Sequence, residues 1–252
     1  MIYRKMSIVS LVVMSVLLCV LAGCGNSTPA EAEATAVPPT DFPPTAESAQ
    51  PPAETTTQWN PDPTQNIHVT NLGGDHVLPR IVIGNKGDIY VAWFSNQNLE
   101  NYDVRMQRYD AAGNAQWGEN GRVISDNKSN TWISDYAFTK DNDGNLILIF
   151  QDIRNGSSNL YAYKFSPDGD PLWGEDGLQI TDNEGFGGPS PTTVSTPNHI
   201  ALLWDQDTAD APKLVIQKLT PGGEKVWGDD GLVVPGQETE SFIQGVMVFG
   251  GG

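Results

Sequence analysis

One pattern, present three times, constrains the fold of this chain more than any other feature. Its second copy is S-P-D-G-D-P-L-W-G-E-D-G-L-Q-I-T at residues 166–181, and the other copies occupy residues 110–125 and 220–235. Each copy has a turn with Gly, a Trp-Gly-acid-Asn/Asp-Gly motif and a short apolar run. Its tryptophans, Trp117, Trp173 and Trp227, recur after 56 and 54 positions. A fixed period of this size predicts a repeat architecture.

The residues between the copies have the pattern of β-strands. Short runs rich in β-branched and aromatic residues alternate with turns of Gly, Pro, Asn and Asp. The predicted strands are Pro79–Ile83, Ile89–Phe94, Asp103–Tyr109, Tyr136–Thr139, Leu146–Phe150, Leu160–Phe165, Thr192–Ser195, Ile200–Trp204 and Lys213–Leu219. The second run of each unit is continuously apolar, which predicts burial on both faces. The third run alternates, more weakly in Leu160–Phe165, which predicts an outer strand with one buried face.

The sequence therefore predicts an all-β domain of four-stranded antiparallel units. Four short strands in ~55 residues suit a β-propeller blade, whose repeats run to ~40 to 50 residues. The units resemble the repeats of secreted, sialidase-like bacterial β-propeller proteins, in the strands Leu203-Trp204-Asp205 and Val215–Leu219 and in the Trp-Gly motif. The second copy is also similar to the Asp-box of sialidases, with Asp170 where that box has Gly. This resemblance implies a structural turn and no catalytic residues.

The repeated Trp-Gly-x-x-Gly motif is interpreted as structural. A Trp buries a large flat surface where sheets stack, and two glycines permit positive φ in a tight connection. The alternative, an aromatic platform for sugars, requires exposed indoles. The motif residues are Trp117, Gly118, Gly121, Trp173, Gly174, Gly177, Trp227, Gly228 and Gly231.

The first 23 residues predict a bacterial lipoprotein signal peptide. Arg4 and Lys5 precede the apolar run Ile8–Val20, and Leu-Ala-Gly leads directly to Cys24. The resemblance to lipoprotein signals implies cleavage before Cys24 and a lipid on its sulfur. The protein is then expected on a bacterial membrane, facing the extracellular or periplasmic side. The alternative is an uncleaved membrane helix, for which the run is short against the ~20 residues needed.

Composition divides the rest of the chain. Residues 24–64 are rich in Pro, Thr and Ala and predict a disordered spacer in which Trp59 is one of few large apolar side chains. Residues 65–252 form the predicted repeat domain. Its units are expected at about 66–125, 126–181 and 182–235, with a partial unit at 236–252 whose apolar run is Ser241–Phe249.

Acidic residues outnumber basic ones, with 31 Asp and Glu, 14 Lys and Arg, and a formal charge of −17. This balance argues against nucleic acid as a partner, because phosphate binding needs a basic surface. It also argues against charge-driven adhesion to anionic lipid.

Carboxylates are the candidate ligand or metal groups. Asp141 and Asp143 precede Gly144 as in the opening of a calcium loop, but the distal Glu is missing, so a hairpin turn is the main interpretation. Asp152 and Asp205 follow apolar strands, where paired carboxylates serve glycosidases. No cofactor other than calcium is suggested.

Two classes of function remain open from the sequence. The first is a lipid-anchored module that binds a glycan, peptide or protein. The second is a glycoside hydrolase or sialidase-like enzyme, although Arg80 and Arg154 are the only arginines suited to bind a substrate carboxylate. Closed propellers have four to eight blades, so three and a half units predict an incomplete reading frame. A minimal ring closed by the terminal strand and an array closed by oligomerisation are the alternatives.

Overall fold

The protein is described here from a computed structural model, which covers residues 59–60, 62–97, 101–129, 136–182, 190–206, 212–236 and 246–248. The predicted signal peptide, Cys24 and most of the predicted spacer lie outside these residues. So does most of the partial unit at 236–252, where residues 246–248 are not in a strand.

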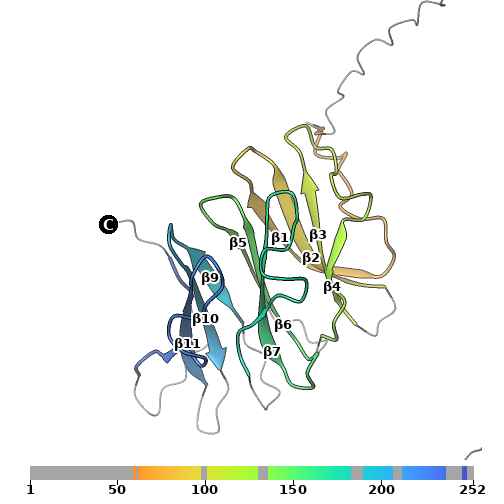
Figure 1. The fold of residues 1–252 in the computed structure, drawn as a ribbon. Helices are drawn as coiled ribbons and strands as arrows, with labels where there is room; N and C mark the ends of the chain where they lie inside the picture. Colours follow the sequence, from red (N-terminus) through yellow and green to blue (C-terminus); the bar gives the residue numbers. More distant parts are fainter. Residues whose placement is uncertain are drawn as a thin grey trace, which may run out of the picture. The chain divides into compact units, whose positions relative to one another are not determined.

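The described residues form three four-stranded antiparallel sheets, here called blades 1, 2 and 3 (Figure 1). Neighbouring strands in each blade are consecutive in sequence, so each blade is a meander. The all-β prediction is confirmed for the described part of the chain. Blade 1 contains β1 (Asp75–Ile83), β2 (Ile89–Asn96), β3 (Asp103–Tyr109) and β4 (Arg122–Ser125). Blade 2 contains β5 (Ala137–Lys140), β6 (Leu146–Asp152), β7 (Asn159–Phe165) and β8 (Leu178–Gln179). Blade 3 contains β9 (Thr192–Ser195), β10 (Ile200–Gln206), β11 (Lys213–Leu219) and β12 (Leu232–Val233).

The blades stack face to face in the manner of a β-propeller. The first strands lie beside one another, since β5 contacts both β1 and β9. Blade 2 therefore lies between the other two, and the alternation of side chains along β6 divides its core. Leu146 and Leu148 belong to the seam with blade 1, whereas Ile147 and Ile149 belong to the seam with blade 3.

The central position of blade 2 corrects the prediction of a half-buried third strand. Every residue of β7 is buried, whereas β3 alternates between buried and partly exposed residues as expected. In β7, Tyr161, Tyr163 and Phe165 fill the seam with blade 1, and Leu160 and Ala162 fill the seam with blade 3. The alternation of L-Y-A-Y-K-F therefore separates residues that face blade 1 from residues that face blade 3, and both sets are buried.

The face of blade 1 that points away from blade 2 is covered by the chain before β1. Ile67 and Val69 pack against a cluster of Val91, Trp93 and Tyr109 on that face. Trp59 also reaches it, because its ring lies 5.9 Å from that of Tyr109. The predicted spacer therefore ends in residues that pack on the domain.

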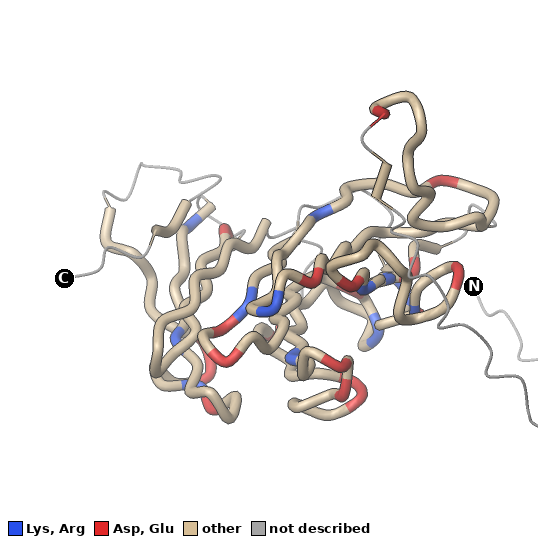
Figure 2. The backbone as a smooth tube through the Cα atoms, turned by 90° about the horizontal axis from the view of Figure 1, so that it is seen from above, with Lys and Arg blue, Asp and Glu red and all other residues tan. Residues whose placement is uncertain are grey.

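No described segment is a helix long and apolar enough to cross a membrane. Both signs of charge are interspersed along the tube in Figure 2, with no continuous basic stripe in view.

Candidate functional site

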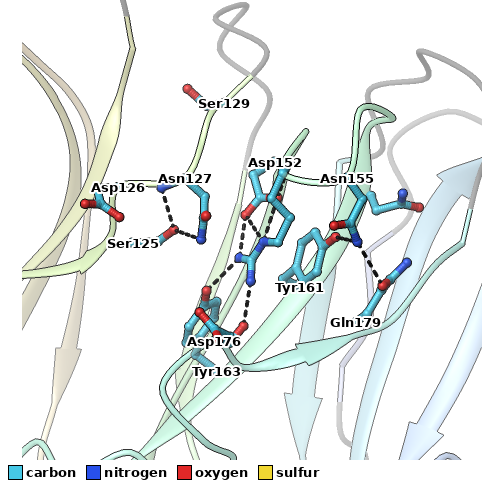
Figure 3. A network of polar contacts seen from close by, with 12 residues as sticks. Ser125, Asp126, Asn127, Ser129, Asp152, Asn155, Tyr161, Tyr163, Asp176 and Gln179 are labelled. Carbon is cyan, nitrogen blue, oxygen red and sulfur yellow. Dashed lines mark hydrogen bonds and ion pairs between the residues drawn. The ribbon is translucent and has the colours of Figure 1, made fainter. Parts of the chain in front are cut away.

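The antiparallel order gives each blade two distinct ends. The β2–β3, β6–β7 and β10–β11 hairpins share one end with the passages from blade to blade, and we call it the connection end. The opposite end, which carries the β1–β2, β5–β6 and β9–β10 turns, is the turn end. The seam between blades 1 and 2 holds a polar network that spreads from the connection end, drawn in Figure 3.

An ion pair in blade 2 is the centre of this network. Asp152, the last residue of β6, is 1% exposed, and the Arg154 side chain is 13% exposed. Arg154 Nε donates to Asp152 Oδ1 at 3.0 Å and to Oδ2 at 2.9 Å, and Nη2 donates to Oδ2 at 2.5 Å. Such a bidentate contact is the strongest arrangement of a guanidinium and a carboxylate.

Two tyrosines of β7 complete the surroundings of this guanidinium. Arg154 Nη2 donates to the Tyr163 hydroxyl at 2.7 Å, and Nη1 donates to the carbonyl of Asp176 at 2.8 Å. The Arg154 guanidinium carbon lies 3.7 Å from the centre of the Tyr161 ring, within the range of a cation–π contact. Burial raises the pKa of both Tyr161 and Tyr163, so both hydroxyls stay protonated at neutral pH. Burial opposes the charge of Arg154, but its bonds to Asp152 and Tyr163 outweigh burial and raise its pKa.

The network continues into the passage from blade 1. The Ser125 hydroxyl accepts the Asn127 side-chain amide at 3.1 Å and the Asn127 backbone N–H at 3.3 Å. Asn101 Oδ1 accepts the Ser129 backbone N–H at 2.7 Å and the Ser129 hydroxyl at 3.0 Å. The Asn101 bonds hold the β2–β3 hairpin against the chain that leaves blade 1, and the backbone N–H of Ile153 in the β6–β7 hairpin donates to the Lys128 carbonyl of the same passage at 2.7 Å.

Neutral amides line the exposed rim of the network. Asn155, in the β6–β7 hairpin, donates to the Tyr161 hydroxyl at 3.1 Å and to Gln179 Oε1 at 3.4 Å. Gln179 Nε2 in turn donates to the carbonyl of Thr181 at 2.9 Å. Asn155 is exposed and Gln179 is partly exposed, so both amides also face water. Gln179 Nε2 also donates to Asp182 Oδ1 at 3.3 Å, so the rim presents neutral amides beside one exposed carboxylate.

Asp152 and Asp205 do not form the carboxylate pair considered from the sequence. Asp152 is on the side of β6 that faces blade 1, with Leu146, Leu148 and Phe150. In β10, Ile200, Leu202 and Trp204 face blade 2, so alternation places Asp205 on the opposite side, away from blade 2. Asp205 Oδ1 accepts the backbone N–H of Ser190 at 3.0 Å. The sheets of blades 2 and 3 therefore separate the two carboxylates. Hydrolysis would require both carboxylates to contact the same substrate.

The predicted arginines also do not form a cluster. Arg154 is held by Asp152, and Arg80 lies over the Tyr136 ring at 5.3 Å.

Asp141 and Asp143 belong to a turn that does not fit a calcium loop. Asp141 Oδ1 accepts the backbone N–H groups of Asp143 and Asn145, at 3.0 and 2.9 Å. Its Oδ2 accepts the Asn145 side chain at 2.9 Å and pairs with Lys164 Nζ at 2.9 Å. The oxygens that calcium needs are already bonded, and no group of three or more His, Cys, Asp or Glu suited to a metal is found among the described residues.

The repeated tryptophans lie between blades. Trp173 is 7% exposed, and its Nε1 donates to the carbonyl of Pro221 in the β11–β12 turn of blade 3, at 3.2 Å. Trp117 lies against the corresponding turn of blade 2, where a Cβ on Gly169 would be 2.9 Å from its ring. Trp227 is partly exposed.

The second glycine of each motif approaches a carbonyl of the third strand. A Cβ on Gly121, Gly177 or Gly231 would lie 2.5 to 2.7 Å from a backbone oxygen, and all three have positive φ. Gly118, Gly174 and Gly228 also have positive φ, but a Cβ there would meet nothing within 4 Å. The first glycine is thus required by backbone conformation, and the second by conformation and space.

The turn end of the same seam contains a small hollow of about 130 Å³. Arg108 crosses it, bonded to Asp88 at 2.9 Å and to Asp168 of blade 2 at 2.6 Å. The guanidinium of Arg108 is thus engaged by two carboxylates. The exposed amides of Asn155 and Gln179 at the rim are therefore the better candidates to bind a ligand.

The sequence analysis did not single out Tyr161, Tyr163, Asn155 or Gln179. One signal was available for Tyr163, because the corresponding position holds Gln107 in blade 1 and Gln217 in blade 3. A large aromatic residue at one of three equivalent positions marks a local departure from the repeat.

The fold and this network define an all-β, propeller-type domain with a polar rim at one end. No family model matches the chain, and no curated protein matches it. Among solved structures, an endo-1,4-beta-xylanase from Bacteroides thetaiotaomicron is 16% identical with a TM-score of 0.41, covering 62% of this chain and 54% of the xylanase. A thermostable family-43 glycoside hydrolase is 15% identical with a TM-score of 0.40, covering 62% and 55%.

An endo-arabinase from Bacteroides thetaiotaomicron is 14% identical with a TM-score of 0.37, and the match covers 66% of this chain and 64% of the arabinase. The chain thus spans between about half and two thirds of the length of these proteins. Likenesses at this level do not bear on its activity.

Proposed function

We propose that this protein is a lipid-anchored binding module on the outer side of a bacterial membrane, and that it binds a glycan at the connection end of blades 1 and 2. The observation that carries the proposal is the rim formed by the amides of Asn155 and Gln179. Asn155 donates to the Tyr161 hydroxyl and to Gln179, so both amides are held in place. A site whose polar groups are fixed before the ligand arrives loses little entropy on binding.

The charge of the rim favours a neutral ligand. Asp152 neutralises Arg154, and the exposed Asp182 carboxylate, which accepts the Gln179 amide at 3.3 Å, adds a negative charge that disfavours an anionic ligand. The formal charge of the chain, −17, repels anionic ligands at a distance. Sugars with hydroxyl groups match donors and acceptors of this kind, so a neutral glycan fits better than an acidic peptide.

Binding fits the carboxylates better than hydrolysis does. Asp152 is buried in an ion pair, and Asp205 lies on a sheet face directed away from blade 2. Hydrolysis requires two carboxyl groups about 5 to 10 Å apart across one glycosidic bond. Asp152 and Asp205 are not such a pair, because the sheets of blades 2 and 3 lie between them.

The lipid anchor is proposed from the sequence alone. Basic residues, the apolar run Ile8–Val20 and Leu-Ala-Gly before Cys24 have the order of a lipoprotein signal. An anchored protein partitions into detergent when membranes are extracted, and Cys24→Ser should move it to the aqueous phase. Retention of the Cys24→Ser protein in the detergent phase would argue against lipid attachment at this residue.

A glycan array, followed by calorimetry on the best neutral oligosaccharide, tests the binding site. We expect Asn155→Ala and Gln179→Ala each to weaken binding about fivefold, since a lost hydrogen bond is worth about 1 kcal/mol. Asn142→Ala, an exposed amide at the turn end, is the matched control and should bind normally. Equal binding by all three variants would place the ligand elsewhere.

Aryl glycosides provide the complementary test. The proposal predicts no turnover by the intact protein. Turnover that disappears in Asp205→Asn would instead establish a hydrolase.

A further inference from the structure

The contact between neighbouring blades has a repeated form that we call the turn seat. In each seam, the turn between the third and fourth strands of one blade fits against the preceding blade. The carbonyl of the second turn residue accepts a hydrogen bond across the seam. Pro167 O accepts the Tyr90 hydroxyl at 2.8 Å, and Pro221 O accepts Trp173 Nε1 at 3.2 Å.

Trp59 makes the same contact with blade 1, although no blade precedes blade 1 in the described chain. Trp59 Nε1 donates to the carbonyl of Ala111 at 2.9 Å, and Ala111 occupies the turn position of Pro167 and Pro221. Trp59 also precedes Trp117 by 58 positions, close to the spacing of the repeat. It therefore takes the place that the Trp of a preceding blade would take.

The residues after Trp59 extend this replacement along blade 1. Ile67 and Val69 pack against Val91, Trp93 and Tyr109 of β2 and β3, and Asn71 binds the Trp-Gly-Glu-Asn-Gly turn. The Asn71 backbone N–H donates to Asn120 Oδ1 at 2.8 Å, and its side chain donates to Glu119 at 2.6 Å. We call residues 59–71 the cap.

The cap leaves the inner part of the blade 1 face uncovered. Ile81 and Ile83 of β1 point to the same side as Val91, and they are 64% and 63% exposed. The corresponding residue to Ile81 in blade 2, Phe138, packs in a seam. Exposed aliphatic residues at a position that is packed elsewhere in the repeat indicate a face shaped for another sheet.

Blade 3 presents the complementary surface. Trp227 lies beside Lys218, whose Nζ is 5.9 Å from the ring centre, as Lys164 lies beside Trp173 at 5.7 Å. Leu232, in the position of Leu178, is 49% exposed. In the described part of the chain no following turn fits against Trp227, so the seat of blade 3 has no occupant there.

We propose that the cap blocks head-to-tail association of this chain, in which blade 3 of one copy would pack on blade 1 of a second copy. Trp59 and the Trp227 of a second copy compete for the carbonyl of Ala111. Displacing the cap opens a surface that continues the blade-to-blade interface already present twice in the molecule. A head-to-tail contact closes into a ring if its rotation allows.

Sedimentation of the chain from Gly25 to Gly252 tests this proposal, and it contains the compact unit Pro52–Gly252. The parent protein should be a monomer. Trp59→Ala with Ile67→Ala should double the mass at high protein concentration, with unchanged circular dichroism. Adding Trp227→Ala to that variant removes the competing indole and should restore the monomer.

A second cap variant keeps the test decisive where the first loses its fold. Thr70→Val with Asn71→Ala removes the side-chain hydrogen bonds of the other end of the cap to Asn120 and Glu119. This variant changes no residue of blade 1. Folded cap variants that stay monomeric would overturn the proposal. Association that persists unchanged with Trp227→Ala would also overturn it, because it would be unspecific adhesion of the exposed face.

Discussion

Blade 2 holds its Trp-Gly segment differently from blades 1 and 3. In blade 1, Gln107 is fully buried, and its side chain accepts the Trp117 backbone N–H at 3.0 Å and donates to the carbonyl of Gly118 at 2.5 Å. In blade 3, Gln217 does the same for Trp227 and Gly228, at 3.2 and 2.7 Å. Blade 2 has Tyr163 at this position.

The seam alone does not account for the difference, because Gln217 lies on the face of β11 directed toward blade 2, with Val215 and Leu219, and is still a glutamine. Gln107 points away from blade 2, whereas Tyr163 lies in the seam with blade 1, stacked between Phe150 and Phe165. Arg154 then bonds the Asp176 carbonyl, within the segment that glutamine holds elsewhere. The central blade thus exchanges a local amide clamp for an aromatic residue and a buried ion pair. The repeat tolerates this exchange because both solutions satisfy the same segment.

Breaking the ion pair should have the largest effect on stability. Asp152→Asn leaves the Arg154 charge buried without its partner, which costs about 3 to 5 kcal/mol. The free energy of unfolding in urea measures this cost. Asp152→Asn with Arg154→Met removes both charges and should recover much of the loss, and no recovery would mean that the pair acts through more than charge.

The next effect should separate the two glycines of the blade 2 motif. Gly177→Ala places a Cβ 2.7 Å from the carbonyl of Ala162 and keeps a positive φ, so we expect a loss of about 3 kcal/mol. Gly174→Ala, the matched control, has only the positive φ and should cost about 1 kcal/mol. Equal losses in urea unfolding would show that the close approach does not exist.

The loss of the glutamine clamp should cost less than breaking the ion pair or substituting Gly177. Gln217→Ala leaves the Trp227 N–H and the Gly228 carbonyl without their side-chain partner, at a cost of about 2 kcal/mol. Tyr163→Phe removes only the hydroxyl bonded to Arg154 and should cost about 1 kcal/mol. Thermal unfolding of both variants measures the two clamps, and a larger loss for Tyr163→Phe would reverse the comparison.

The smallest effect should appear in acid. Burial raises the pKa of Asp141, but hydrogen bonds from Asn145 and Lys164 outweigh burial, and the pKa lies below its ordinary value. A carboxyl with a lowered folded pKa stabilises the protein above its unfolded pKa, and the stabilisation disappears as pH falls through the folded value. Asp141→Asn should therefore cost about 1 kcal/mol at pH 7 and progressively less below about pH 4.

Asp143→Asn is the control for this pH series, because Asp143 is exposed in the same turn. Its unfolding should match the parent at every pH. A constant difference between Asp141→Asn and the parent across the series would show that the charge of Asp141 is not involved.

The sequence was sufficient for the strands but not for the contacts between blades. The predicted strands match the observed ones closely, as for Asp103–Tyr109 and Thr192–Ser195, because alternation and turn residues are local signals. The sheet face on which Asp152 and Asp205 each lie could also be read from the repeat in the sequence. Aligning blades 2 and 3 through Trp173 and Trp227, which are 54 positions apart, shows that Asp205 corresponds to Gln151, one residue from Asp152.

The cap and the polar network depend on distant contacts. Trp59 precedes two prolines and lacks the Gly-x-x-Gly that marks the other copies, so its role appears only from the bond to Ala111. The short spacing of Asp152 and Arg154 is compatible with an exposed hairpin, and only the position of blade 2 between two sheets buries this pair.

The central claim is that Trp117 and Trp173 each fit against the turn of the next blade, and nuclear magnetic resonance tests it directly for Trp173. A Cβ on Gly223 would lie 3.1 Å from Trp173 Nε1, so the indole N–H proton is close to the α-protons of Gly223. We predict a nuclear Overhauser effect between these protons, assigned by its loss in Trp173→Phe. An indole proton of Trp173 with such effects only to residues of its own blade would contradict the stacked arrangement.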